Sequence, residues 1–215
     1  MKKMLAMVAL TATTAIAAHA QPGDHVALGV GVGFNSYRDG AFSSQNPAIV
    51  PEYHFGFASH GNRQGLSLGL MGGISYLAPD RRDFIGGFQT RNGNLRMVPV
   101  MVGAGPSYRT GPFRVGVGVV AGPSFNSFSV DDGARAAYRD RLGATLNSIN
   151  VENSFAVQPN LSAWYNLTNW MGLHSSAGYT FNRPMVRTTV DGVTSSTRWN
   201  TDGWSYQAGL AFGLF

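Results

Sequence analysis

The sequence predicts an all-β fold, an eight-stranded antiparallel up-and-down transmembrane β-barrel, and three observations support this class. Apolar residues recur at every second position over most of the chain beyond residue 20, which is the period of a strand with one apolar face. The links between these segments are alternately short and long. The faces opposite the apolar ones are rich in Gly, Ala and Ser, which form a poor exterior for a soluble sheet.

The first twenty residues have the layout of a cleavable secretory signal. Lys2 and Lys3 form a basic start, an apolar stretch follows, and Ala18-His19-Ala20 is a small-residue cleavage site. We therefore expect a signal peptide at 1–20 and a single domain at 21–215, outside the cytoplasm. The chain has no Cys, which excludes disulfides and a lipid-anchored N-terminus.

The first four strands are predicted near 26–34, 49–57, 66–76 and 95–107. In the first of them Val30, Val32 and Phe34 alternate with glycines. The register of the fourth stays open, because two sets of residues there can form the outer face: Val98, Val100 and Val102, or Leu95, Met97 and Met101.

The last four strands are predicted near 113–119, 155–165, 171–181 and 204–215, each with the same alternation. No segment beyond the signal approaches the roughly 20 apolar residues of a spanning helix. Strands of about 10 to 13 residues do match a tilted strand that crosses a bilayer.

The connections indicate how the strands are arranged. The short links lie at 59–64, 109–112 and 166–169, and the long ones at 38–47, 77–94, 126–152 and 182–203. Short periplasmic turns and long outer loops are typical of outer-membrane barrels. Within the third long loop, residues 131–146 can form a short helix capped by Asp131 or Asp132, but we favour a mobile solvated loop.

Closure of the sheet follows from backbone chemistry, because in hydrocarbon every N–H and C=O group must be paired within the protein. Eight strands enclose a lumen that side chains can fill. The polar residues on the inward faces are expected to form a hydrogen-bonded plug, with a gated polar path as the alternative. They are Glu52, His54, Arg114, Gln158, Asn160, His174, Ser176 and Gln207.

On these features the chain resembles the small outer-membrane β-barrel proteins of Gram-negative bacteria, the OmpA/OmpX-like barrel superfamily. The resemblance implies an outer-membrane location, a monomer, and contacts with outer-membrane lipid, lipopolysaccharide and the barrel assembly machinery. The family's terminal strand signal would correspond to Trp204, Tyr206, Leu210, Phe212 and Phe215. Here the apolar alternation is one residue out of step with Phe215.

Aromatic residues near strand ends are expected to form girdles at the membrane surfaces. They are Tyr37, Tyr53, Tyr76, Tyr108, Trp164, Tyr165, Trp170, Tyr179, Trp199 and Trp204.

Most of the arginines lie in or beside the long loops. A guanidinium is a bidentate donor to phosphate, so these residues can contact lipopolysaccharide, or they can be solvated or paired with nearby Asp. The residues that we expect at such a contact are Arg81, Arg82, Arg135, Arg139, Arg141, Arg187 and Arg198.

The sequence predicts a structural or surface-interaction role with at most a narrow pore, and two alternatives stay open. His174 and Ser176 faintly resemble the His-x-Ser pair of a lipid A deacylase, but our register turns both inward. A soluble lipocalin-like binder of small ligands would need the opposite distribution of apolar residues. The histidines have no metal-ligand spacing, no cofactor is implied, and a net charge that falls from +5 to +3 without Lys2 and Lys3 does not indicate nucleic-acid binding.

Overall fold

The computed structural model describes residues 27–43, 48–52, 57–58, 64–168 and 171–213. These residues form antiparallel strands and one helix, which confirms the all-β class. The predicted signal peptide, Tyr53, His54, Trp170 and Phe215 lie outside the described residues, and so does the side chain of Glu52. The elements are β1 (Ala27–Tyr37), β2 (Phe42–Ser43), β3 (Ala48–Glu52), β4 (Phe57–Ala58), β5 (Gly65–Ile74), β6 (Asp80–Ile85), β7 (Phe88–Thr110), β8 (Phe113–Val130), α2 (Asp132–Leu142), β9 (Leu146–Val151), β10 (Ser154–Asn166), β11 (Met171–Thr180), β12 (Met185–Val190), β13 (Val193–Arg198) and β14 (Gly203–Gly213).

One continuous antiparallel ladder joins the long strands. Its order is β5-β7-β8-β10-β11-β14-β1-β3, and the short strand β4 pairs with β5 at the other end. The first and last long strands are therefore neighbours, since β1 pairs with β14 along its whole length from Ala27 to Tyr37. The interval between β3 and β4 falls on residues 53–56, which are not described.

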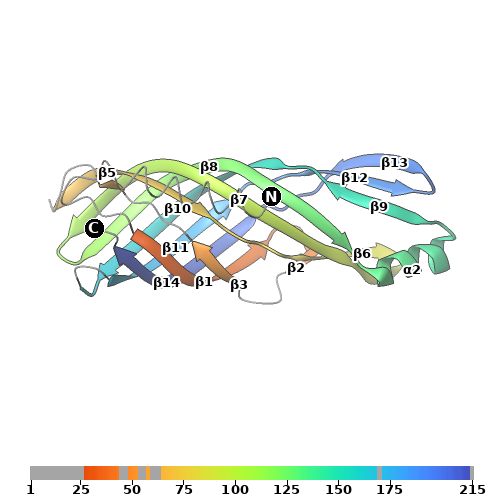
Figure 1. Ribbon diagram of the computed structural model, residues 1–215, viewed down its shortest axis with the longest axis horizontal. Helices are drawn as coiled ribbons and strands as arrows, with labels where there is room; N and C mark the ends of the chain where they lie inside the picture. The colour runs from red at the N-terminus through yellow and green to blue at the C-terminus, as the bar shows by residue number, and fades with distance from the viewer. Residues whose placement is uncertain (1–26, 44–47, 53–56, 59–63, 169–170, 214–215) are drawn as a thin grey trace, which may run out of the picture.

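The molecule is elongated, and its strands run along the long axis (Figure 1). The turn between β7 and β8 lies at one end, and β6, α2, β9, β12 and β13 gather at the other. We call the part at this second end the extension, which consists of β2, β6, α2, β9, β12 and β13 with residues 88–97 of β7 and 125–130 of β8. We call the other strands, with the remainder of β7 and β8, the wall.

Burial along β7 resolves the register that the sequence leaves open. Leu95, Met97 and Met101 are buried, whereas Val102 on the opposite face is 69% exposed. The set that contains Val98, Val100 and Val102 therefore faces outward, and the leucine and methionines face inward. Gly103, which also faces inward, has no room for a side chain, because a Cβ there would overlap the carbonyl group of Val119 on β8.

The long loops are more ordered than the sequence predicts, and this is a correction. Residues 77–94 contain β6 and the start of β7, joined by a Gly86–Gly87 turn, and residues 182–203 contain the hairpin of β12 and β13. Alternation is weak in these segments because polar residues stand at successive positions, as in DRRD of β6 and TSSTR of β13, so the strand period does not stand out.

The segment 131–146 contains a helix and not the mobile loop that we favoured. Asp131 caps α2 by accepting a hydrogen bond from the backbone N–H of Gly133, and Gly143 ends the helix in the left-handed region. Ala134 and Ala137 face the protein and are buried. The sequence indicates the capping residue, but it does not show the packing of the helix on β6, β7 and β9, which holds the helix in place.

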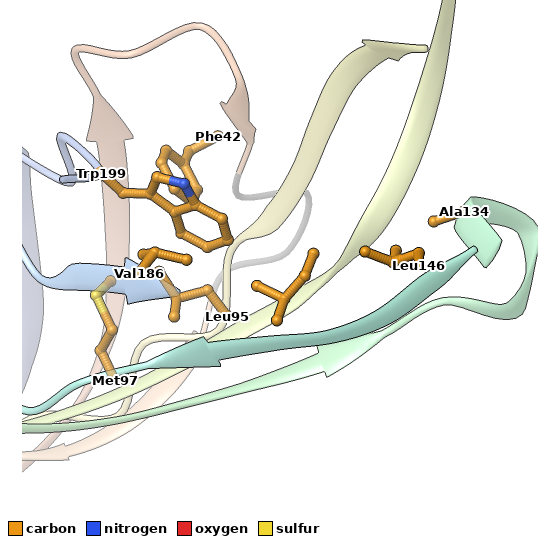
Figure 2. Packing of buried hydrophobic residues seen from close by; sticks show 8 residues of the cluster. Phe42, Leu95, Met97, Ala134, Leu146, Val186 and Trp199 are labelled. Carbon is orange, nitrogen blue, oxygen red and sulfur yellow. The ribbon is translucent and has the colours of Figure 1, made fainter. Parts of the chain in front are cut away.

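The extension has its own apolar core, drawn in Figure 2. Trp199 is 6% exposed and packs edge-on against Phe42 and Phe128, at ring-centroid distances of 5.7 Å and 5.1 Å. The buried members of this extension core are Phe42, Leu95, Met97, Ala134, Leu146, Ile149, Val186 and Trp199. They come from β2, β7, α2, β9 and β12 and from the segment after β13, so segments that are far apart in the sequence pack into one body.

Candidate functional site: outer surface, lumen and extension

The outer surface of the wall is a band of exposed apolar side chains. Leu68 is 63% exposed and Val102 is 69% exposed, although neighbouring inward positions are partly or fully buried. Other exposed members of this band are Phe34, Leu66, Leu70, Val117, Val119, Phe155, Leu161, Leu173 and Leu210. A continuous apolar surface of this extent is typical of a protein that faces lipid.

Exposed aromatic rings mark both borders of this band. Tyr165 lies opposite Phe113 near the short turns. Tyr179, opposite Trp204 at a ring-centroid distance of 5.3 Å, lies toward the extension. Along β10, Tyr165 and Phe155 are ten residues apart, which matches the roughly 9 to 11 residues of a strand that crosses a bilayer.

Three of the predicted girdle residues face inward instead. Trp199 belongs to the extension core, Tyr37 packs against the same core, and Trp164 lies in the lumen with its ring 4.1 Å from that of His174. The sequence around an aromatic residue near a strand end does not show on which face of the strand it lies. Only the register of the strands distinguishes the aromatic residues that face outward from those that face inward.

Polar side chains line the lumen from the short turns to the middle of the wall. Arg114, Gln158 and Asn160 lie on the inward faces of β8 and β10. Gln158 donates a hydrogen bond to Ser205 at 2.8 Å. These residues lie on the faces that the alternation predicts, and Gln158 bonds to a residue of β14, two strands away in the sheet.

His174 and Ser176 also point into the lumen. His174 is 5% exposed, and the Ser176 hydroxyl donates to Gln207 at 3.4 Å. A lipid A deacylase would need both groups at the lipid-facing surface. Their position therefore argues against the deacylase alternative.

An apolar layer lies beside Gln158, which is opposite Val120 in the ladder. Met101, Val120 and Ala156 are buried there, and Met71 packs against them. The sequence predicts a hydrogen-bonded plug of inward polar residues and does not identify this apolar layer. These side chains share the inward face with glycines and serines, and in a narrow lumen they contact each other across the strands.

A closed ring of hydrogen bonds separates the apolar layer from the extension core. Ser124 donates to Asn126 at 2.9 Å, and Asn126 donates to Ser154 at 2.9 Å. Ser154 then donates to Asn182 at 2.6 Å, and Asn182 donates back to Ser124 at 3.3 Å. Each of the four side chains donates once and accepts once within the ring, so the hydrogen bonds can polarise each other cooperatively. We call this set the polar ring.

A buried carboxylate lies beside the polar ring. The side chain of Asp202 is 1% exposed, and it accepts hydrogen bonds from the backbone N–H of Asn182 at 2.9 Å and from Arg183 at 2.6 Å. The hydrogen bond that Arg183 donates to Asp202 and the charge of Asp202 raise the pKa of Arg183. Sequence reasoning missed Asn182 and Asp202, since both follow or precede a strand and belong to no periodic face.

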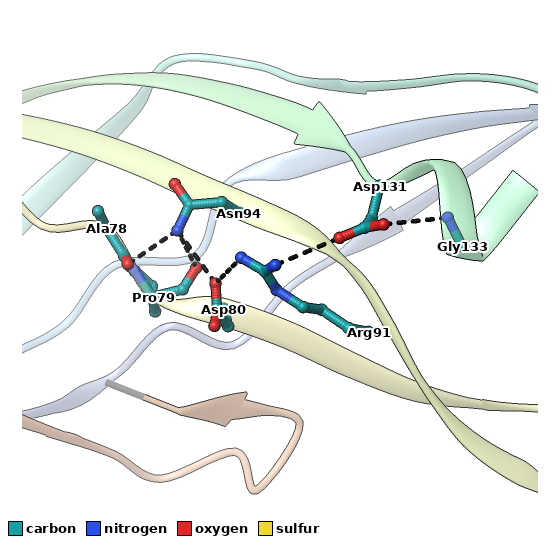
Figure 3. Close-up of polar contacts among 7 residues, drawn as sticks. All are labelled: Ala78, Pro79, Asp80, Arg91, Asn94, Asp131 and Gly133. Carbon is teal, nitrogen blue, oxygen red and sulfur yellow. Dashed lines mark hydrogen bonds and ion pairs between the residues drawn. The ribbon is translucent and has the colours of Figure 1, made fainter. Parts of the chain in front are cut away.

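The extension is crossed by ion pairs that join separate segments. Arg91 donates to Asp80 at 2.7 Å and to Asp131 at 3.3 Å, and Asp131 also caps α2 through Gly133 (Figure 3). One guanidinium thus links β6 and β7 to the start of the helix, and the hydrogen bond that Arg91 donates to Asp80 raises the pKa of Arg91.

Several of the arginines that we expect to contact lipopolysaccharide have partners within the protein. Arg81 is 12% exposed, pairs with Asp83 at 2.8 Å and lies 4.1 Å over the ring of Trp199. At this position most of the guanidinium faces Asp83 and Trp199, so little of Arg81 is exposed. Arg82 is partly buried, and its Nε atom has no solvent contact.

Of the other arginines in that set, three have partners within the protein. Arg135 pairs with Asp132 at 3.2 Å, and Arg187 pairs with Glu152 at 2.5 Å. Arg141 donates to Thr90 and lies 4.8 Å over the ring of Phe88. Arg139 and Arg198 are exposed.

The terminal strand presents its large side chains outward. In β14, Trp204, Tyr206 and Leu210 are between 41% and 49% exposed, and Gln207 lies on the inward face. The side chain of Phe212 is not described. Among the residues that the structure covers, no group of three His, Asp or Glu side chains could hold a metal ion, and no helix is long and apolar enough to cross a membrane.

The fold is similar to those of two solved outer-membrane proteins. The crystal structure of the outer membrane protein OprG from Pseudomonas aeruginosa has a TM-score of 0.56 and 12% identity, over 90% of this chain and 97% of that chain. The solid-state NMR structure of the outer membrane protein AlkL in DMPC lipid bilayers has a TM-score of 0.51 and 18% identity, over 90% and 91%. No protein-family model and no curated protein matches the sequence. The chain therefore has the fold of the small outer-membrane β-barrel proteins, and the resemblance found in the sequence is confirmed at the level of the fold.

Proposed function

We propose that this protein is a bacterial outer-membrane β-barrel of eight strands. In this proposal β3 and β4 are two parts of one strand, which pairs with β1 on one side and with β5 on the other. The band of exposed apolar residues on the wall supports a lipid surrounding, because it would be costly in water. The same band disfavours the soluble lipocalin-like alternative.

The proposed role is to present an ordered surface outside the cell, with at most a narrow pore through the barrel. The observation that carries this role is the extension core, in which loops that are far apart in sequence pack around Trp199 and Phe42. Loops that served only to connect strands would not need such a core. The apolar layer, the polar ring and the extension core lie in succession along the lumen. Because their side chains fill the lumen at these levels, we do not expect a wide channel.

Two measurements test this proposal. Protein extracted from a washed outer-membrane fraction should migrate as a compact species on a gel without boiling and shift on heating. In planar bilayers it should give no conductance of the size of a general porin. Recovery in a soluble fraction without a heat shift would overturn the barrel, and a large steady conductance would overturn the closed lumen.

We further propose that Arg139 and Arg198 meet lipopolysaccharide phosphates, since both guanidinium groups are exposed. The double variant Arg139→Gln and Arg198→Gln should retain less lipopolysaccharide during purification. Arg135→Gln is a matched control, because Arg135 is already paired with Asp132. Equal retention by all three proteins would count against this contact.

The assembly machinery is the second proposed partner, through the outward aromatic and apolar side chains of β14. Trp204→Ser with Tyr206→Ser should lower the amount of assembled barrel. Substitution of the inward Gln207 by Asn, on the same strand, should not. No loss in the double variant would indicate that recognition rests on other residues.

A further inference from the structure

The strand β13 is the most exposed strand whose side chains the structure describes. All six of its residues, Val193 to Arg198, are exposed, and Val193 is 74% exposed. It forms one end of the three-stranded sheet β13-β12-β9. Within the described part of the chain no strand pairs with its other edge, so that edge is open to a further strand.

The turn before β13 defines which backbone groups this edge presents. Asp191 and Gly192 have φ angles of +49° and +79° and connect Val190 to Val193, which lie opposite each other. In a two-residue hairpin of this kind the flanking pair exchanges both of its backbone hydrogen bonds. The alternate residues Thr194, Ser196 and Arg198 therefore direct their N–H and C=O groups to the open edge.

The usual protections of an edge strand are absent from β13. It has no Lys and no Pro, and the irregularity in this sheet lies between β12 and β9, where the register shifts at Thr189 and Val190. Protected edges generally carry charges, prolines or bulges that prevent a further strand from pairing. Its one charged residue, Arg198, stands at the very end.

We propose that the open edge of β13 pairs antiparallel with β13 of a second copy of this protein. The charges at the two ends of the edge favour this occupant and this direction. Asp191 precedes the strand and Arg198 ends it, and both are exposed. An antiparallel pair brings each Asp191 near the Arg198 of the other copy, whereas a parallel pair brings like charges together.

The backbone pattern also restricts the register of this pair. Residues that direct their backbone groups to the edge must lie opposite residues that do the same. A two-fold axis at Ser195 satisfies this condition, since it sets Thr194 opposite Ser196 of the second copy. Small hydroxyl side chains then face each other across the new ladder, and Asp191 is one residue out of line with the opposing Arg198.

The direction of β13 determines where the second copy stands. β13 runs along the long axis of the molecule, as the strands of the wall do (Figure 1). A copy that pairs antiparallel must point its barrel the opposite way, so it must stand in a facing membrane. The inference rests on the proposed outer-membrane location, and it assigns the extension to contact between two membrane surfaces.

The test is clustering of phosphatidylcholine vesicles that carry the full chain, followed by light scattering. The wild-type protein should cluster vesicles, and Ser196→Pro should reduce scattering to the level of protein-free vesicles. Proline there removes an N–H group that points to the open edge and leaves the ladder to β12 intact. The matched control Ser196→Ala removes the same hydroxyl, retains the N–H, and should cluster normally.

A heat shift on gels is measured for every sample, so that failure to form a barrel is distinguished from failure to pair. A folded wild-type barrel that does not cluster vesicles overturns the pairing, and so does clustering by Ser196→Pro equal to that by Ser196→Ala. A protein without a heat shift overturns the proposed function first.

A cysteine crosslink tests the direction, because the natural chain contains no Cys. Ser195→Cys is placed in two vesicle populations that carry different epitope tags, and the mixture is oxidised with diamide. Crosslinked dimers with both tags support pairing between facing membranes. Dimers with one tag only would indicate pairing within one membrane and overturn the proposal, as would the absence of any dimer.

Discussion

The wall and the extension distribute their apolar residues in opposite ways, although the same strands run through both. On β7 the wall exposes Val102 and has Gly103 on its inward face, whereas the extension buries Leu95 and exposes Arg96. In the wall the outward face is apolar and the lumen is filled with small groups. In the extension the inward face is apolar, and the outward face carries polar residues such as Arg96, Ser127 and Ser129 beside a few exposed apolar ones such as Phe84. The inversion lies at the level of the polar ring.

This difference shows what each region uses for stability. Side chains on the wall remain exposed in the isolated molecule, so a lipid surrounding has to supply their apolar environment. The extension buries its own apolar side chains and behaves in this respect as a small water-soluble domain. The stability of the wall therefore depends on its lipid surrounding, and the stability of the extension depends on its own packing.

The largest expected effect is on the extension core. Trp199→Ala should cost about 3–5 kcal/mol locally, because it removes the largest side chain of that core and leaves a cavity. Limited proteolysis in detergent should then cut the extension, while the heat shift of the wall persists. The matched control is Trp204→Ala on the wall surface, where Trp204 is 49% exposed and the extension should stay resistant. Loss of the heat shift with Trp199→Ala would show that the two regions are one cooperative unit.

A single charge placed on each outward face sharpens the comparison. Val102→Arg should destabilise the folded protein in bilayers by about 2–4 kcal/mol, because arginine would face the hydrocarbon. Phe84→Arg in the extension should change the free energy of folding by less than about 0.5 kcal/mol, since that position faces water. Both residues are about equally exposed, at 69% and 76%. The free energy of folding of both variants is measured in vesicles by titration with denaturant. Equal destabilisation by the two substitutions would refute the assignment of the apolar band to lipid.

The polar ring at the boundary between the regions should have an intermediate effect. Ser154→Ala removes the acceptor of Asn126 and the donor to Asn182, and unsatisfied buried groups of this kind cost about 1–3 kcal/mol. The temperature of the gel shift should fall accordingly. Ser129→Ala, at an exposed position on β8, serves as the control and should leave the temperature unchanged. If both variants behave like the wild type, the ring contributes nothing to the boundary.

The smallest effect is expected at the surface of α2. Arg135→Ala breaks the ion pair with Asp132, in which Arg135 is 49% exposed and Asp132 is 96% exposed. Exposed pairs of this type contribute about 0–1 kcal/mol, so the stability of the extension in proteolysis should not change measurably. A clear loss of resistance would mean that the helix surface contacts something beyond solvent.

The strand positions and their inward and outward faces can be predicted from the sequence because a strand has a period of two. Arg114, Gln158, His174 and Ser176 lie on the inward faces that alternation assigns to them. The alternation fails near residues 95–107, where Val98 and Met97 are both apolar. Only burial in the structure separates a valine that faces outward from a methionine that fills the lumen.

The extension depends on tertiary structure for a different reason. Its residues come from segments that are each too short and too polar to show a period, and Trp199, Phe42 and Leu95 meet only when the strands are paired. The same holds for the polar ring, whose four side chains lie on β8, on β10 and beyond β11. Alternation along one strand therefore suffices for the wall, while contacts between distant segments decide the extension, its ion pairs and the open edge of β13.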